Sequence, residues 1–272
     1  SIGSYAFSNC LSLPSVSLPD SVTSISDNAF SGCKKLSSVH WSEKLQTIGR
    51  SAFLNCVSLE EITFPKTVKT LNSSSFAGCS SLVSVSFTEN SKGGFYVSIG
   101  DSAFENCIGL ENVSFSKNIT SLGSNAFSNC SSLVSVVLDD SITQIQNSVF
   151  RNCSALESIS LPSKLQSLGA RFIAGTQVSS LTIPASLTTC SIDYDRNYDY
   201  YGPLGGADNL TELILESGME TIPANLARVE SYSGTHLKSV SIPGTVTSIG
   251  SYAFSNCLSL PSVSLPDSVT SI

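Results

Sequence analysis

One pattern recurs along this chain, in most cases every 23 residues. It reads I-G-x-x-A-F-x-[NG]-C-x-x-L-x-x-V-x-L-P-x-x-V-x-x, as in residues 2–24 and 48–70. A unit of this length cannot bury its apolar face alone, so its copies must stack on one another as a repeat solenoid. The positions that open the copies, and the one that closes the last, are Ile2, Ile25, Ile48, Leu71, Ile99, Leu122, Ile145, Leu168, Cys190, Ile222, Ile249 and Ile272.

The part of each copy that follows its leucine is expected to form a β-strand. In residues 13–18, Val16 and Leu18 alternate with serines, so one face of the strand is buried and the other is wet. One strand per coil gives a parallel sheet on one face of the stack. Proline, as at Pro19, has no amide hydrogen for the ladder and ends the pairing. A second extended segment, as at 22–25, lines another side.

The A-F-x-[NG]-C element predicts a short helical turn. Polar side chains stand before it, where an oxygen is able to cap free amides: Ser4, Asp27, Ser73, Asp101, Ser124, Asn147 and Ser251. Only Gly and Asn enter the left-handed region readily, so the residue before each Cys is predicted to have a positive φ. The phenylalanines of this element are expected to stack as an aromatic spine, with a shorter second spine at the last inward position of the strand: Trp41, Phe64, Phe87 and Phe115.

These motifs resemble the BspA-like leucine-rich repeats, also called the TpLRR class. The strand motif L-x-x-V-x-L-P stands at Leu13–Pro19 and the A-F-x-[NC]-C motif at Ala6–Cys10. The likeness covers essentially the whole chain, most cleanly 1–168 and 237–272. The resemblance implies a surface-exposed or secreted protein of host-associated microbes, often an adhesin that binds extracellular host proteins. It brings no catalytic residues and no fixed binding motif.

The repeat phase also predicts the domain organisation. We expect a single leucine-rich-repeat solenoid over residues 1–272 with about eleven coils, an insertion at 89–97, and irregular coils and insertions within 168–236. The segments 1–25 and 248–272 are identical, and neither has the polar cap that terminal coils normally need. We therefore expect a fragment of a longer repeat protein, or head-to-tail self-stacking through uncapped ends.

Charge and hydropathy exclude two classes of partner. The net charge is −7 and no basic face is evident, so the chain is not expected to bind nucleic acid. No apolar run approaches the ~20 residues of a membrane helix, so this segment is not expected to insert into a membrane.

The cysteines and histidines offer no catalytic or metal constellation. The nine cysteines stand mostly one per coil. A row on successive coils cannot converge on one ion, and the odd count favours buried free thiols. His40 has no nucleophile or acid placed beside it by a motif. The stretch from Asp193 has the alternating oxygens of a calcium loop, but Tyr198 and Leu204 stand where that loop needs Gly and an acid. We predict no enzyme activity, no metal and no cofactor.

The insertion within 193–207 is the predicted contact site. It holds half of the chain's eight tyrosines, and insertions in solenoids form loops at which partners often bind. The predicted binding residues are Tyr194, Tyr198, Tyr200, Tyr201, Asp195 and Asp199. The alternative is that these rings fold back and fill the gap where coils lack the A-F-x-N-C element.

The expected function is that of a non-catalytic, adhesin-like binding protein, extracellular or on the cell surface. It would present a Ser-rich sheet face and inserted loops to an extracellular protein or glycan. The rival interpretation is a stalk or spacer that displays another domain. A glycan-active enzyme is disfavoured because no pair of carboxylates is marked out.

Overall fold

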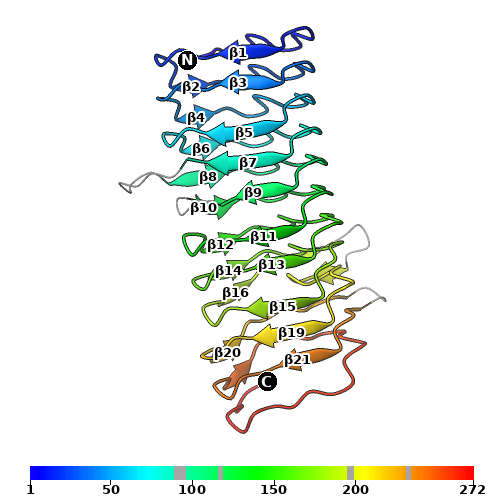
Figure 1. Ribbon diagram of the computed structural model, residues 1–272. Helices are drawn as coiled ribbons and strands as arrows, with labels where there is room; N and C mark the ends of the chain where they lie inside the picture. The colour runs from blue at the N-terminus through cyan, green and yellow to red at the C-terminus, as the bar shows by residue number, and fades with distance from the viewer. Residues whose placement is uncertain (89–95, 116–118, 195–198, 231–233) are drawn as a thin grey trace. The chain divides into compact units, whose positions relative to one another are not determined.

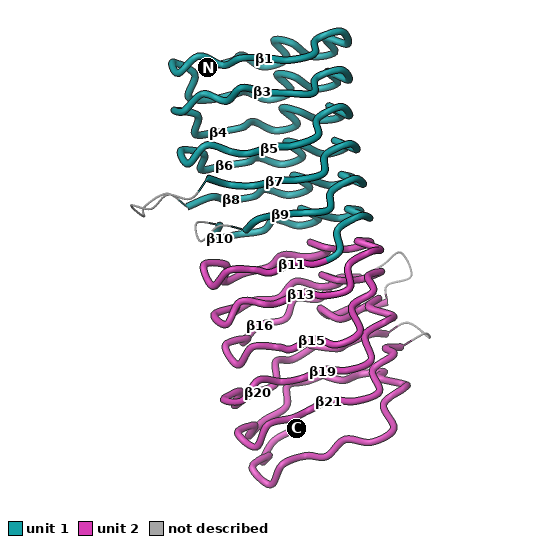
Figure 2. The backbone as a smooth tube through the Cα atoms, in the orientation of Figure 1, with its two compact units in different colours: residues 1–134 teal, residues 135–272 magenta. Residues whose placement is uncertain are grey.

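The computed structural model describes residues 1–88, 96–115, 119–194, 199–230 and 234–272. The chain forms two compact units, which we call unit 1 (1–134) and unit 2 (135–272) (Figure 2). Within each unit the coils succeed one another in chain order, as a solenoid requires (Figure 1). A single stack over the whole chain, and its number of coils, stay predictions.

Unit 1 contains two rows of parallel strands. The first row is β1 (Ser15–Ser17), β3 (Ser38–His40), β5 (Glu61–Phe64), β7 (Ser84–Phe87) and β9 (Asn112–Ser114). β1 pairs with β3, and β7 lies between β5 and β9. The second row is β2 (Ser24–Ile25), β4 (Thr47–Ile48), β6 (Thr70–Leu71), β8 (Val97–Ile99) and β10 (Ile119–Leu122). Val16 pairs with Val39, so the register follows the repeat.

Unit 2 also contains both kinds of row. The first kind is β11 (Ser135–Val137), β13 (Ser158–Ser160), β15 (Ser180–Ile183), β19 (Glu212–Leu215) and β21 (Ser239–Ser241). The second kind is β12 (Gln144–Ile145), β14 (Ser167–Leu168), β16 (Thr189–Cys190), β20 (Thr221–Ile222) and β22 (Ser248–Ile249). One hairpin departs from this pattern, because β17 (Asp193–Tyr194) and β18 (Tyr200–Tyr201) pair antiparallel.

The predicted short helical turn is wrong, because no helix occurs among the described residues. Each A-F-x-[NG]-C element is a turn with two left-handed residues. The left-handed residue predicted before each Cys is confirmed, with φ 58° at Asn9 and 73° at Gly32. A second stands four residues earlier, at Tyr5, Asn28, Ser51, Ser74, Ser102, Asn125, Ser148, Arg171 and Tyr252. These residues break any helical run, so turn amides bond to the next coil, as Phe30 N does to Ala52 O at 2.8 Å.

The expected capping is also wrong, for the same reason. The Asp27 carboxylate accepts a 2.7 Å hydrogen bond from Arg50 N, which lies 23 residues further on. Asp101 likewise accepts from Ser124 N at 2.8 Å. With no helical turn beside them, these side chains satisfy amides of the following coil. They therefore tie coil to coil rather than cap their own turn.

Stacked phenylalanines form the core of unit 1, as predicted. Phe53 and Phe76 have ring centroids 5.0 Å apart and are parallel to within 3°. Phe76 and Phe104 are 5.5 Å apart, and the rings of Phe64 and Phe87 in the second spine are 5.0 Å apart. Trp41 meets Phe76 edge-on. The column packs ring on ring, so it is a core and not a ligand platform.

The glycine of the left-handed column provides a stability test. Gly78 has φ +72°, and a Cβ there would lie 2.2 Å from Asn55 Oδ1. Gly78→Ala is expected to lower the free energy of unfolding by about 1–2 kcal/mol because an L-residue is strained in this region. Gly244→Ala is the control, since a Cβ there meets nothing within 4 Å and its φ is not positive. Chemical denaturation of both variants checks this, and equal losses would contradict it.

The cysteine row lies inside the stack. Six of the nine thiols are buried, none of the nine forms a disulfide, and Cys10 in the first coil is exposed. Successive thiols donate to the carbonyl of a phenylalanine one coil earlier, as Cys33 Sγ does to Phe7 O at 3.0 Å and Cys56 Sγ to Phe30 O at 3.1 Å. These groups therefore act as compact core residues with one weak hydrogen bond each.

Burial also links these thiols to the pH dependence of stability. Loss of hydration raises the pKa of Cys56 and of Cys107 to about 12. An unfolded thiol titrates near pH 8.5, so the folded state binds the proton more tightly. Their contribution is therefore complete below about pH 8.5 and is lost as the pH rises toward 12. Urea unfolding between pH 7 and 11 should show this decline, and Cys56→Ala with Cys107→Ala should make it shallower. An unchanged slope would contradict the assignment.

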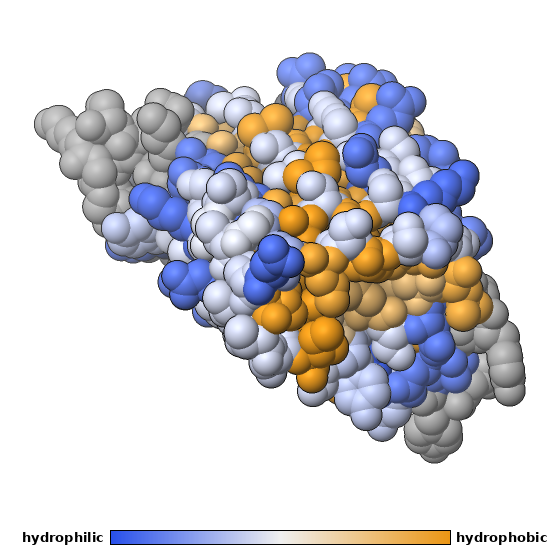
Figure 3. Space-filling view, turned by 90° about the horizontal axis from the view of Figure 1, so that it is seen from below, coloured by the Kyte–Doolittle hydropathy of each residue, from blue (hydrophilic) through white to orange (hydrophobic). Residues whose placement is uncertain are grey.

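Apolar residues are not confined to the core. Figure 3 shows a band of them, between hydrophilic margins, on the face seen from below. In the last coil of unit 2, Leu258, Val263 and Leu265 are exposed. Stacking of chains through such coils stays a prediction.

Candidate functional site

The tyrosine insertion of unit 2 is an ordered hairpin where it is described. In it Asp193 pairs with Tyr201 and Tyr194 with Tyr200. The second strand is also held from the other side, because Tyr201 forms an antiparallel bridge with Val229. Glu230 N donates to Tyr200 O at 2.9 Å. Two insertions that are separate in the sequence, at 193–207 and 227–236, therefore meet at one site.

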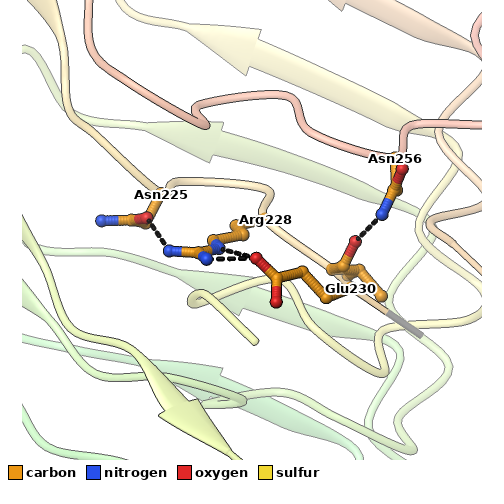
Figure 4. Close-up of polar contacts among 5 residues, drawn as sticks. Asn225, Arg228, Glu230 and Asn256 are labelled. Atoms are coloured by element: carbon orange, nitrogen blue, oxygen red, sulfur yellow. Dashed lines mark hydrogen bonds and ion pairs between the residues drawn. The ribbon is translucent and has the colours of Figure 1, made fainter. Parts of the chain in front are cut away.

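Arg228 fixes this junction (Figure 4). Its guanidinium lies 4.7 Å from the ring centroid of Tyr200 and 4.2 Å from that of Tyr252. In its plane it donates to Asn225 Oδ1 at 3.1 Å and forms an ion pair with Glu230. The guanidinium thus stacks on aromatic rings with its faces and donates hydrogen bonds from its edge. The two tyrosine rings are thereby held in fixed positions.

Arg171 provides a second stack beside the first. Its guanidinium carbon lies 3.7 Å from the ring centroid of Tyr201. We call Tyr194, Tyr200, Tyr201 and Tyr252, together with Arg171 and Arg228, the tyrosine–arginine surface. An open depression of 390 Å³ adjoins it, and is lined by Arg151, Asn152, Arg171, Ala174, Gly175, Tyr201, Gly206 and Asp208.

The structure places the described members of the predicted site together on this hairpin. Tyr194 is 61% exposed and Tyr200 is 37% exposed, with ring centroids 6.3 Å apart. Tyr201 and Asp199 are half-buried. Asp195 and Tyr198 lie outside the described residues.

The core of the irregular coils is filled by their own side chains, which include the fully buried Phe172. Ile173 stands two residues before Gly175 and Leu204 two before Gly206, as Phe30 stands before Gly32, and all three glycines have a positive φ. Ile173 and Leu204 are buried. The described rings of the hairpin therefore lie outside the core.

Sequence reasoning missed the arginines. The chain has five, of which three stand at 171, 196 and 228, within the irregular part of the repeat, and a fourth at 151, in the coil before it. That local concentration in an acidic chain was the available signal. Tyr252, which stacks on Arg228, gave no such signal in the sequence because it belongs to a regular coil.

Other chemistry is sparse in the described residues. No group of three or more His, Cys, Asp or Glu side chains has the geometry of a metal site among them. His236 Nδ1 lies 3.9 Å from Asp208 Oδ1, and both side chains are exposed. Within the described ranges, no helix is long and apolar enough to cross a membrane.

Parallel strands repeated once per coil, joined by left-handed turns, define a leucine-rich-repeat solenoid. The chain belongs to the BspA-type leucine-rich repeat family, whose model matches in six copies over residues 1–93, 95–194 and 227–272. The unmatched stretch 195–226 includes β18 and three of the eight residues that line the depression: Tyr201, Gly206 and Asp208. None of the curated proteins matches this chain.

Solved structures share the fold. A leucine-rich repeat protein from Bacteroides ovatus is 28% identical, with a TM-score of 0.68 over 98% of this chain and 70% of that one. A leucine-rich repeat protein from Eubacterium ventriosum is 20% identical, with a TM-score of 0.50 over 98% of this chain and 77% of that one. The second likeness shows the fold alone.

Proposed function

We propose that this protein is a non-catalytic binding protein, extracellular or on the cell surface, that contacts a macromolecular partner through the tyrosine–arginine surface. The observation that carries the proposal is the exposure of tyrosine rings on a braced hairpin whose second strand lies in the stretch that the family repeat does not cover. A loop with no part in the repeat is free to serve recognition.

The surface has the physical properties of a contact site. Tyrosine and arginine are enriched among residues that dominate binding energies, because they bury large area with few rotatable bonds. Here Arg228 already orders Tyr200 and Tyr252 before any partner arrives. Pre-ordered side chains lose less entropy on binding, which increases affinity.

The Ser-rich sheet face is the second candidate surface. Its exposed hydroxyls form ladders between coils, as Thr63 and Ser86 do at 3.0 Å. Hydroxyls that bond to each other have less capacity for a partner, so we place the main contact on the hairpin. A passive stalk that displays another domain remains the rival function.

A binding screen separates these functions. The purified chain is passed over immobilised collagen, laminin and fibronectin, and the response is measured by surface plasmon resonance. Saturable binding with a Kd below about 0.1 mM supports the binding protein. If none of the three matrix proteins binds the chain saturably at chain concentrations up to about 0.1 mM, the result supports the stalk and contradicts the proposal.

A further inference from the structure

We propose that the depression beside Tyr201 binds the carboxylate of an acidic sugar, such as a sialic or uronic acid, on the glycans of the partner. This inference rests on the proposed function and specifies the chemistry of its site. Two arginines, a tyrosine, an asparagine and an aspartate line the depression, and all of them belong to unit 2.

The charge of the depression favours an anion. The protein as a whole carries a net charge of −7, yet Arg151 and Arg171 both line this one hollow. Among the described residues neither guanidinium has a carboxylate partner. An arginine fork matches a carboxylate with two parallel hydrogen bonds, so an anionic ligand satisfies donors that the described chain leaves to solvent.

Arg171 is held in place before any ligand arrives. Its guanidinium face lies on the Tyr201 ring at 3.7 Å, a contact that leaves the in-plane N–H groups for hydrogen bonds. Its backbone has φ 54°, a left-handed conformation that non-glycine residues rarely adopt. The coil stack imposes this conformation, because Arg171 N donates to Gly202 O at 3.0 Å.

The rest of the lining favours a sugar over an acidic peptide. Among the described residues of the lining, Ala174 supplies the only aliphatic side chain, and Gly175 and Gly206 supply backbone, so these residues form no apolar pocket for a peptide anchor. Asn152 and Asp208 bring amide and carboxylate groups that suit sugar hydroxyls. Asp208 also opposes a ligand with several carboxylates. A volume of 390 Å³ lies in the range of small-ligand sites.

The test is titration of the whole chain with 3′-sialyllactose and with a glucuronic-acid disaccharide, each compared with neutral lactose, by saturation-transfer NMR and calorimetry. We expect at least one acidic sugar to bind in the millimolar range and lactose not to bind. Arg171→Gln should weaken that binding by about tenfold or more. Arg50→Gln, an exposed arginine of unit 1, should leave it unchanged.

Two further measurements exclude a folding artefact. Thermal melting must be preserved in Arg171→Gln, and Arg171→Lys, which keeps the charge without the planar fork, should bind with intermediate affinity. Equal affinity for lactose, preference for a tetraglutamate peptide, or unchanged affinity in Arg171→Gln would overturn the inference. If the chain binds a matrix protein but no acidic sugar, the inference of an acidic-sugar site is overturned and the proposed binding function is not.

Discussion

Phe76→Ala is expected to lower the free energy of unfolding by about 3–5 kcal/mol, the usual cost of truncating a fully buried phenylalanine. Phe76 is completely buried and stacks between Phe53 and Phe104. Neighbouring coils fix both partners, so they cannot close over the cavity without breaking ladders on either side. The loss is therefore expected at the upper end of that range. Urea unfolding of unit 1 measures it.

Phe7→Ala is the matched control. It stands in the same column but is 40% exposed and stacks on Phe30 alone. Less area returns to water and no enclosed cavity forms, so its cost should be about 1–1.5 kcal/mol. Similar losses for both variants would show that the column does not hold the coils together.

Tyr194→Ser combined with Tyr200→Ser is expected to weaken binding of a matrix protein by about thirtyfold or more. That figure corresponds to about 2 kcal/mol, the threshold of a binding hot spot. Both rings are exposed, so melting should change little. The stack of Tyr200 on Arg228 is lost, worth about 0.5–1 kcal/mol at an exposed site, together with the contact between the two tyrosine rings. The hairpin itself persists because Glu230 donates to the backbone carbonyl of Tyr200.

The control is Tyr96→Ser, in the insertion of unit 1. Tyr96 is 66% exposed, close to Tyr194, so it tests exposed tyrosine without the arginine stacks. Its binding should equal that of the parent chain. If Tyr96→Ser weakens binding as much as the double variant, tyrosine content and not the hairpin governs binding. If the double variant melts many degrees lower, the hairpin is structural.

The sequence predicted what the repeat phase controls. Asn9 and Gly32 reveal a left-handed position because few other residues adopt it readily. The second left-handed position escaped notice, because Ser51, Tyr5 and Arg171 have no such preference. There the conformation is imposed by hydrogen bonds between coils, as from Ser51 N to Ser73 O at 3.0 Å. A local motif cannot reveal a constraint that comes from a neighbour 23 residues away.

The sequence indicated only part of the candidate site, because contacts between distant segments leave no local motif. Clustered tyrosines mark the insertion in the sequence, but nothing local joins Tyr200 to Arg228 or Arg228 to Tyr252. Those contacts arise only when successive coils bring distant segments together. The break in the repeat at Cys190 located the hairpin, and only the fold showed what braces it.

The central claim is that partners meet the tyrosine–arginine surface. It is tested most directly by hydrogen exchange of the chain with and without a bound matrix protein, read by mass spectrometry. The account predicts slowed exchange in peptides covering 199–207 and 225–230, with the strands of the Ser-rich face unchanged. Protection confined to β1, β3, β5, β7 and β9, with none in those two peptides, would contradict it.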